Sequence, residues 1–176
     1  MSHRLALAVS AAALVTAAAT PALASGHPAP ARTGAAHQRF AITFVTINGK
    51  DRPIRVVAAG PVSGRGTMTQ RIVKQTATGG VLLATVTLPD GSVKLRVNDS
   101  DTSTVDLHSC TGRQSGKGTW RIVSGSGAYR NASGSGTFVR RVFIVGAFDR
   151  HAKCLGQSAP PVAETGTVVA DGTAAR

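Results

Sequence analysis

Short β-branched runs alternate with turn residues along the chain from about residue 39 onward. No window of helical length places apolar residues at i, i+3, i+4 and i+7, so the pattern predicts strands and excludes a helical domain. Asn48-Gly49-Lys50-Asp51 and Pro89-Asp90-Gly91 supply residues that favour tight turns, and each is expected to close a hairpin. The sequence therefore predicts a nearly all-β domain.

Nine strands are expected from these runs. They are Arg39 to Ile47, Ile54 to Ala59, Thr67 to Ala77, Val81 to Leu88, Ser92 to Val97, Ser103 to Ser109, Gly118 to Ser124, Gly136 to Phe148, and Glu164 to Ala170. Apolar and charged residues alternate most clearly from Val93 to Val97, which indicates one buried and one wet face. So many short strands need protected edges, which predicts a small closed antiparallel β-barrel of about eight to nine strands. A β-sandwich is the alternative, because both folds need the same alternation.

The first residues differ in composition from the rest. Met1 to Arg4 is a short basic start, an Ala-rich apolar run follows, and Ala22-Leu23-Ala24 ends the segment. This order is typical of a secretory signal peptide at 1–24, with an N-terminal membrane anchor as the alternative. Residues 25–38 contain Pro and Gly without apolar periodicity and are expected to be a flexible lead-in, so that the domain covers 39–176. We expect a secreted, extracellular protein with no stable membrane insertion after the leader is removed.

Charge sets limits on the partner. The chain has 20 Lys and Arg against 8 Asp and Glu, a formal charge of +12, and the leader holds only Arg4 of these cations. The cations are spread over strands and turns, and the chain has few aromatic residues to interleave with them, which argues against nucleic acid. Attraction to anionic cell-envelope polymers fits this surface better. Arg140-Arg141 are adjacent, so on a strand they point to opposite faces and one of them can lie inside a barrel or at its rim.

Cys110 and Cys154 are the two cysteines of the chain. With His108 and His151 they offer two thiolates and two imidazoles, a set that can hold a tetrahedral metal ion. In an oxidising compartment an even pair of cysteines is more simply a disulfide, and the interpretation preferred here is a Cys110–Cys154 bond with no metal.

The most specific stretch runs from Gly118 to Phe138 and has the form G-x-[WY]-x-I-x-x-G-[ST]-G-x-Y-x-x-A-x-G-x-G. It resembles the bacterial secreted proteins with an allene oxide cyclase barrel-like fold, which are distantly similar to plant dirigent proteins. Gly60 to Gly66 and Pro89 to Ser92 resemble further segments of that group, and Cys110 and Cys154 fall where many of its members carry a cysteine pair. The resemblance covers about Phe40 to Thr173. It implies a barrel, and the named enzymes of the group act without a cofactor.

Candidate site residues are few. Trp120 can stack on a ligand or serve as a packing anchor. Arg141 can hold a carboxylate at the barrel rim. Glu164, the chain's one glutamate, is expected either at the barrel mouth or as a solvated carboxylate at a strand end. The glycines of 125–136 suit turns, bulges and tight corners, and their spacing matches no phosphate-binding loop. Neither a nucleophile elbow nor a paired carboxylate at catalytic spacing is found, so no catalytic residue is assigned.

Three functional hypotheses follow. The first is a secreted, non-catalytic β-barrel whose interior is filled or holds one small apolar ligand, with no cofactor. The second is a cofactor-independent cyclase or isomerase of the allene oxide cyclase or dirigent type. The third is a basic module that binds anionic cell-envelope polymers.

Overall fold

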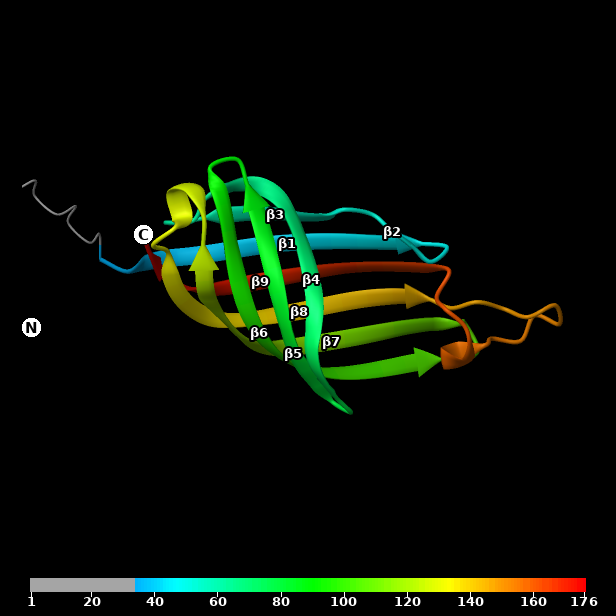
Figure 1. Ribbon diagram of the computed structural model, residues 1–176. Coiled ribbons are helices and arrows are strands. Elements are labelled where there is room, and N and C mark those ends of the chain that lie inside the picture. Colours follow the sequence, from blue (N-terminus) through cyan, green and yellow to red (C-terminus); the bar gives the residue numbers. More distant parts are fainter. Residues whose placement is uncertain (1–33) are drawn as a thin grey trace, which may run out of the picture. The chain divides into compact units, whose positions relative to one another are not determined.

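The computed structural model describes residues 34–176, so the expected signal peptide at 1–24 and most of the expected lead-in lie outside the described residues. Eight antiparallel strands close into a barrel, and the short strand β2 extends its rim (Figure 1). The strands are β1 (Ala36–Ile47), β2 (Lys50–Asp51), β3 (Ile54–Ala59), β4 (Gly64–Thr76), β5 (Gly79–Leu88), β6 (Gly91–Asp106), β7 (Thr111–Gly125), β8 (Ser133–Val145) and β9 (Ala163–Ala175). Two single-turn helices, η1 (Gly127–Tyr129) and η2 (Gly156–Ser158), lie in connections. No helix in the described part of the chain is long and apolar enough to cross a membrane.

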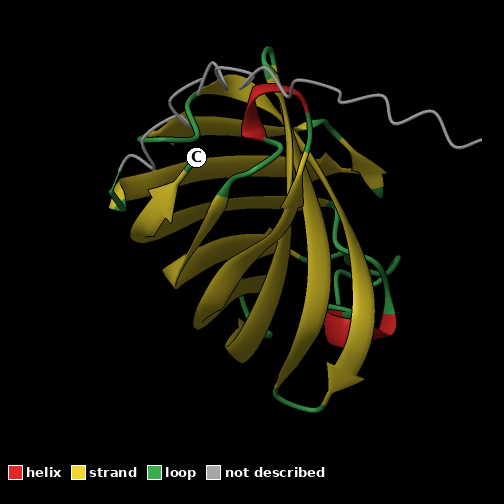
Figure 2. Ribbon diagram, turned by 60° about the vertical axis from the view of Figure 1, so that its left-hand side comes forward, coloured by secondary structure: helices red, strands yellow, loops and turns green. Residues whose placement is uncertain are grey.

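The ring closes where the first strand meets the last. Each barrel strand pairs with the next one along the chain, and β1 also pairs with β9 from Ala36↔Ala174 to Ile47↔Ala163. Figure 2 shows these strands curving around a common interior. The all-β class and the closed barrel are confirmed. The sandwich alternative is wrong, because hydrogen bonding runs continuously around one ring and residues 34–176 contain no second sheet.

Both hairpins predicted from turn residues are present. Ile47 pairs with Lys50, so Asn48 and Gly49 form a two-residue turn, and both have the positive φ, 50° and 71°, that a type I′ turn requires. Leu88 pairs with Gly91, which leaves Pro89 and Asp90 as the turn between β5 and β6.

Strand β6 differs from the expectation. The polar residues after Val97 predicted a break between strands at 92–97 and 103–109, but the structure has one strand from Gly91 to Asp106. Its partner β7 begins at Thr111 instead of Gly118 and pairs with β6 along its whole length. The break was wrong because Asp99 and Asp101 point into the barrel, where they have a cationic partner. The other strands overlap their expected ranges.

Strand β1 begins at Ala36, three residues before the expected start of the domain. Gln38 belongs to this strand and its side chain is fully buried. Its amide Nε2 donates to the carbonyl oxygen of Val62 at 2.8 Å, and its Oε1 accepts from the Val62 amide at 2.9 Å. A glutamine in a polar stretch therefore bonds the backbone of the β3–β4 loop and is not part of a flexible lead-in.

One end of the barrel holds a close-packed core. Along each strand, alternate residues point inward and are buried, as Phe40 and Ile42 are on β1. The β3–β4 and β7–β8 loops close this end, because Val62 and Tyr129 are both fully buried and the Tyr129 hydroxyl donates to the Ser63 carbonyl oxygen at 2.7 Å. The buried core comprises Phe40, Ile42, Val56, Ala58, Val62, Ala84, Val86, Leu88, Val93, Leu95, Trp120, Ile122, Tyr129, Phe138, Ala170 and Ala174.

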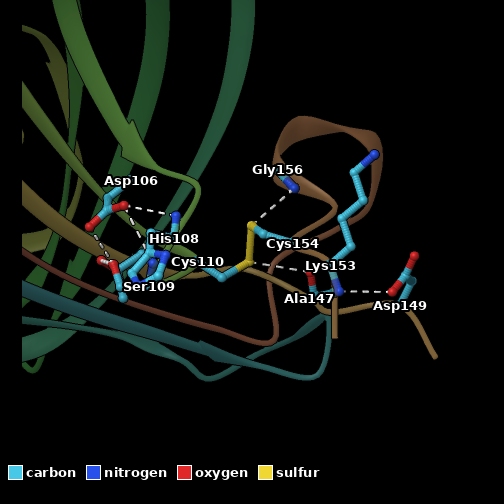
Figure 3. The surroundings of a disulfide bond; sticks show 10 residues. Asp106, His108, Ser109, Cys110, Ala147, Asp149, Lys153, Cys154 and Gly156 are labelled. Carbon is cyan, nitrogen blue, oxygen red and sulfur yellow. Dashed lines mark hydrogen bonds between the residues drawn. A yellow bond between two sulfur atoms is a disulfide. The ribbon is translucent and has the colours of Figure 1, made fainter. Parts of the chain in front are cut away.

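The predicted disulfide is present at the opposite end. Cys110, in the β6–β7 turn, is bonded to Cys154, in the β8–β9 connection, with the Cα atoms 5.3 Å apart (Figure 3). The Asp106 carboxylate supports the turn by accepting hydrogen bonds from the Ser109 hydroxyl at 2.7 Å and the His108 amide at 2.9 Å, and these bonds lower the pKa of Asp106. Because the disulfide uses both thiols, the metal-binding alternative loses its two sulfur ligands.

Candidate ligand-binding site

Three charged side chains meet inside the barrel. Asp99 and Asp101 project from β6 and Arg140 from β8, and their side chains are only 6%, 21% and 20% exposed. Arg140 Nη1 lies 3.1 Å from Asp99 Oδ2, while its Nη2 bonds Asp101 Oδ1. The Nε2 of Gln114 on β7 donates to Asp101 Oδ2 at 3.4 Å. One guanidinium therefore bridges two carboxylates in the barrel interior.

A glycine makes this bridge possible. Asp101 is paired with Gly116 on β7, and Gly116 is paired in turn with Arg140 on β8, so Gly116 lies between the two charged partners. A methyl group at Gly116 would overlap the Asp101 carboxylate and would lie 3.2 Å from both Arg140 Nε and Asp99 Oδ1. Because glycine has no side chain, Arg140 can lie across β7 and reach β6.

Two large aromatic side chains inside the barrel also lie over glycines. Phe138 lies over Gly118, and Trp120 lies over Gly172, since a methyl group at either glycine would come within 2.8 Å of the neighbouring aromatic ring. Trp120 also packs edge-to-face on Phe40 with the ring centroids 5.4 Å apart. Several glycines of these strands therefore serve close packing inside the barrel and not only its turns and corners.

The charges of this cluster do not balance when both carboxylates are ionised. Burial raises the pKa of Asp99 above its ordinary value of 3.8, and the nearby Asp101 raises it further, while Arg140 opposes both effects. Asp101 has both of its oxygens hydrogen-bonded, whereas Asp99 Oδ1 is buried without a partner among the described residues. Asp99 thus keeps its proton to higher pH than an ordinary aspartate does.

A small chamber lies between this cluster and the core. Its volume is about 60 Å³ and its walls are mainly apolar. We call this cavity the interior chamber. It is lined by Phe40, Ile42, Met68, Gln70, Leu82, Ala84, Leu95, Val97, Asp99, Trp120, Phe138, Arg140, Val168 and Ala170. Three of the polar atoms on these residues, Asp99 Oδ1, Trp120 Nε1 and Arg140 Nε, are buried with no hydrogen-bond partner within the described chain. Buried polar atoms are nearly always paired in proteins, so three unpaired atoms on residues that line one chamber make it the candidate site for a polar ligand group.

The chamber continues toward the disulfide-bonded end of the barrel. Two wider cavities of about 260 and 240 Å³ are each lined in part by Gln70, Gln114 and Arg140, and Gln70 and Arg140 also line the chamber. Glu164 and Arg52 line the larger of the two cavities. Together these cavities form a mouth whose walls carry more polar groups than the chamber does.

The three candidate residues proposed from the sequence lie in three different places in the structure. Trp120 is buried, lines the chamber and is also a packing anchor. Glu164 lies on the inward face of β9 at the mouth. Arg141 differs from the expectation: it is exposed on the outer face of β8, and its neighbour Arg140 is the arginine that enters the barrel. Adjacent strand residues point to opposite faces, so only one of the two can be inside.

Sequence reasoning missed Asp99, Asp101 and Arg140 as a group. A signal for the first two was available, because they continue the inward set Val93, Leu95 and Val97 at intervals of two. Comparison with protein-family models, curated proteins and solved structures found no match to this chain. The functional argument therefore depends on the geometry of the chamber.

Proposed function

We propose that this protein binds one small molecule inside its barrel, with an apolar part in the interior chamber and an oxygen atom at the polar cluster. The observation that carries the proposal is a group of three buried, unpaired atoms, Asp99 Oδ1, Trp120 Nε1 and Arg140 Nε, that belong to residues lining one mainly apolar chamber. Leaving such atoms unsatisfied costs roughly 1–3 kcal/mol each. A ligand oxygen that pairs with them recovers part of this cost.

The donors and acceptors define the class of ligand. Trp120 Nε1 and Arg140 Nε can only donate, so the ligand group near them must accept, as a carbonyl or ether oxygen does. Asp99 Oδ1 accepts when ionised and can donate when protonated, and burial extends the protonated form of Asp99 to higher pH than in an ordinary aspartate. We therefore expect an uncharged, oxygen-bearing apolar compound.

The chamber volume limits the size of the buried part. At about 60 Å³ it is smaller than the roughly 150 Å³ apolar cavity that accepts benzene in another protein. The ligand accordingly inserts a short alkyl or branched end, and the rest of it lies in the wider mouth. This arrangement supports the ligand-holding form of the first hypothesis, a non-catalytic β-barrel that holds one small apolar ligand.

A cofactor-independent cyclase or isomerase is the second candidate, and one observation favours it. Asp99 lines the chamber, has a raised pKa and has one buried, unpaired oxygen, so its protonated form can donate a hydrogen bond or a proton to the oxygen of a bound compound. Recovery of the bound compound after incubation distinguishes the two functions. A non-catalytic barrel releases it unchanged, whereas an isomerase releases a rearranged product that is absent with Asp99→Asn.

The single tryptophan provides the binding test. We expect linear methyl ketones of increasing length to change the Trp120 emission, with affinity rising roughly fourfold for each methylene until the chamber is full, because each buried methylene contributes about 0.8 kcal/mol. Ala84→Leu fills the chamber and should abolish the response. Ala59→Leu, on the exposed face of β3, is the matched control and should respond as wild type. Equal responses from both variants would contradict binding in the chamber.

A further inference from the structure

The outer face of three neighbouring strands carries mainly cations. Its one acid within these strands is Asp106, at the end of β6, and the Asp106 carboxylate is hydrogen-bonded within the β6–β7 turn. Six exposed residues make up this surface, which we call the basic face: Lys94 and Arg96 on β6, Arg113, Lys117 and Arg121 on β7, and Arg141 on β8. They occupy the positions that alternate with the buried residues of the same strands. The other two carboxylates of β6, Asp99 and Asp101, have the opposite phase and point inward to Arg140.

None of the six cations forms an ion pair within the described chain. The ion pairs on the barrel's outer surface belong to Asp171 on β9, whose carboxylate lies 3.5 Å from His37 and 3.9 Å from Arg39. The basic face therefore keeps its charge uncompensated, whereas the surface at β1 and β9 does not.

Two arginines of the basic face are directly opposite each other. Arg96 on β6 is paired in register with Arg121 on β7. On their other sides, Arg96 pairs with Leu83 of β5 and Arg121 pairs with Ser135 of β8, and neither of these partners carries a charge. Like charges at opposed positions of a sheet destabilise it. The fold gains nothing from this pair, and an anion placed between the two guanidiniums would remove the repulsion.

The shape of the basic face fits an extended chain. Arg113 and Arg121 are eight residues apart on β7, roughly 27 Å at the rise of a β-strand, and the face is three strands wide, about 10 Å between the outer strand axes. Hydroxyl groups lie among the cations, because Ser100 pairs with Lys117 and Ser115 with Arg141. A narrow band of cations and hydroxyls suits a linear phosphate polymer, whose anions repeat along its length.

The aromatic residues argue against single-stranded nucleic acid as the occupant. Stacking platforms for bases use exposed aromatic rings. Trp120 and Tyr129 are buried in the barrel. Among the outward-facing residues of β6, β7 and β8, the one aromatic residue is Phe143, which pairs with Arg113. Recognition by this face therefore depends on charge and hydrogen bonding to phosphate.

We propose that the basic face binds a linear phosphate polymer of the cell envelope, independently of the barrel interior. Long-chain inorganic polyphosphate is the probe, and binding is measured by titration at several salt concentrations. The double variant Arg96→Gln/Arg121→Gln should weaken binding at least about fivefold and reduce the slope of log Kd against log salt by about two, because two phosphate contacts are lost. The same variant should unfold at a slightly higher temperature than wild type, because the opposed charges are gone.

The matched control removes the same charge elsewhere. Arg55→Gln/Arg65→Gln changes two exposed arginines of β3 and β4 and should alter the affinity less than twofold. Equal weakening by the two double variants would overturn the proposal, since it would show a response to net charge alone. Tighter binding of an oligothymidylate of the same charge would also overturn it, in favour of nucleic acid.

Discussion

Arg140 on β8 reaches Asp101 on β6 across Gly116, the β7 residue that pairs with both. The bridge spans three strands of the barrel and lies where the mainly apolar chamber meets the polar mouth. Its geometry positions Asp99, which lines the chamber and whose second oxygen is buried without a partner among the described residues. The predictions below test this cluster and the features that support it.

Gly116→Ala should break the bridge. The added methyl group overlaps the Asp101 carboxylate and approaches Arg140 Nε, so we expect a loss of about 1–3 kcal/mol in the free energy of unfolding in urea. Gly112→Ala, on the same inward face of β7, is the control. Its methyl group meets its nearest neighbour at 3.4 Å, and its effect should stay within about 0.5 kcal/mol of wild type. Equal effects of the two substitutions would show that Gly116 is not specially required.

Arg140→Met should destabilise the protein at neutral pH by about 3 kcal/mol or more, because it leaves two buried carboxylates without their cation. Burial raises the pKa of Asp99, so protonation removes the charge of this carboxylate as the pH falls, and part of the lost stability should return. Circular dichroism during urea unfolding at several pH values measures this. A deficit that is the same at every pH would mean that Arg140 acts by packing alone.

Asp99→Asn should change the pH dependence of stability. Burial raises the pKa of Asp99 above 3.8 in the folded protein, so the folded state binds this proton more tightly than the unfolded chain does. The free energy of unfolding therefore falls as the pH rises from 3.8 through the folded-state pKa. The asparagine variant lacks this decline and should have a flatter profile than wild type over the same window. Parallel profiles for the two proteins would contradict the raised pKa.

Reduction of the Cys110–Cys154 bond should lower stability by about 4 kcal/mol in the chain-entropy account, because the bond closes a loop of 44 residues. The double variant Cys110→Ser/Cys154→Ser should match the reduced protein in urea unfolding. The ketone response of Trp120 should survive in this variant at low urea, since neither cysteine lines the interior chamber. Loss of the response in a folded variant would place the disulfide in the binding site.

Much of the fold was predictable because its signals are local. Asn48-Gly49 and Pro89-Asp90 fix two hairpins. Many short alternating strands predict a closed sheet, because an open sheet would leave exposed edge strands. The disulfide followed from the cysteine count and the expected export. Each of these inferences uses residues that are close in sequence or a composition rule.

The polar cluster was not predictable in the same way. Asp99 and Asp101 looked like a strand break because aspartate is seldom buried without a partner, and their partner lies 39 residues beyond Asp101. The choice between Arg140 and Arg141 depends on the phase of β8. Phe138, buried in the core, shares its face with Arg140 and fixes that phase, but burial of Phe138 is known only from the fold.

A high-resolution crystal structure of the protein soaked with a short methyl ketone tests the central claim most directly. We predict the ketone in the interior chamber, with its oxygen accepting a hydrogen bond from Trp120 Nε1 or Arg140 Nε and its alkyl end against Ala84 and Leu95. A chamber filled by the protein's own side chains, with these two nitrogens bonded to protein groups, would contradict it.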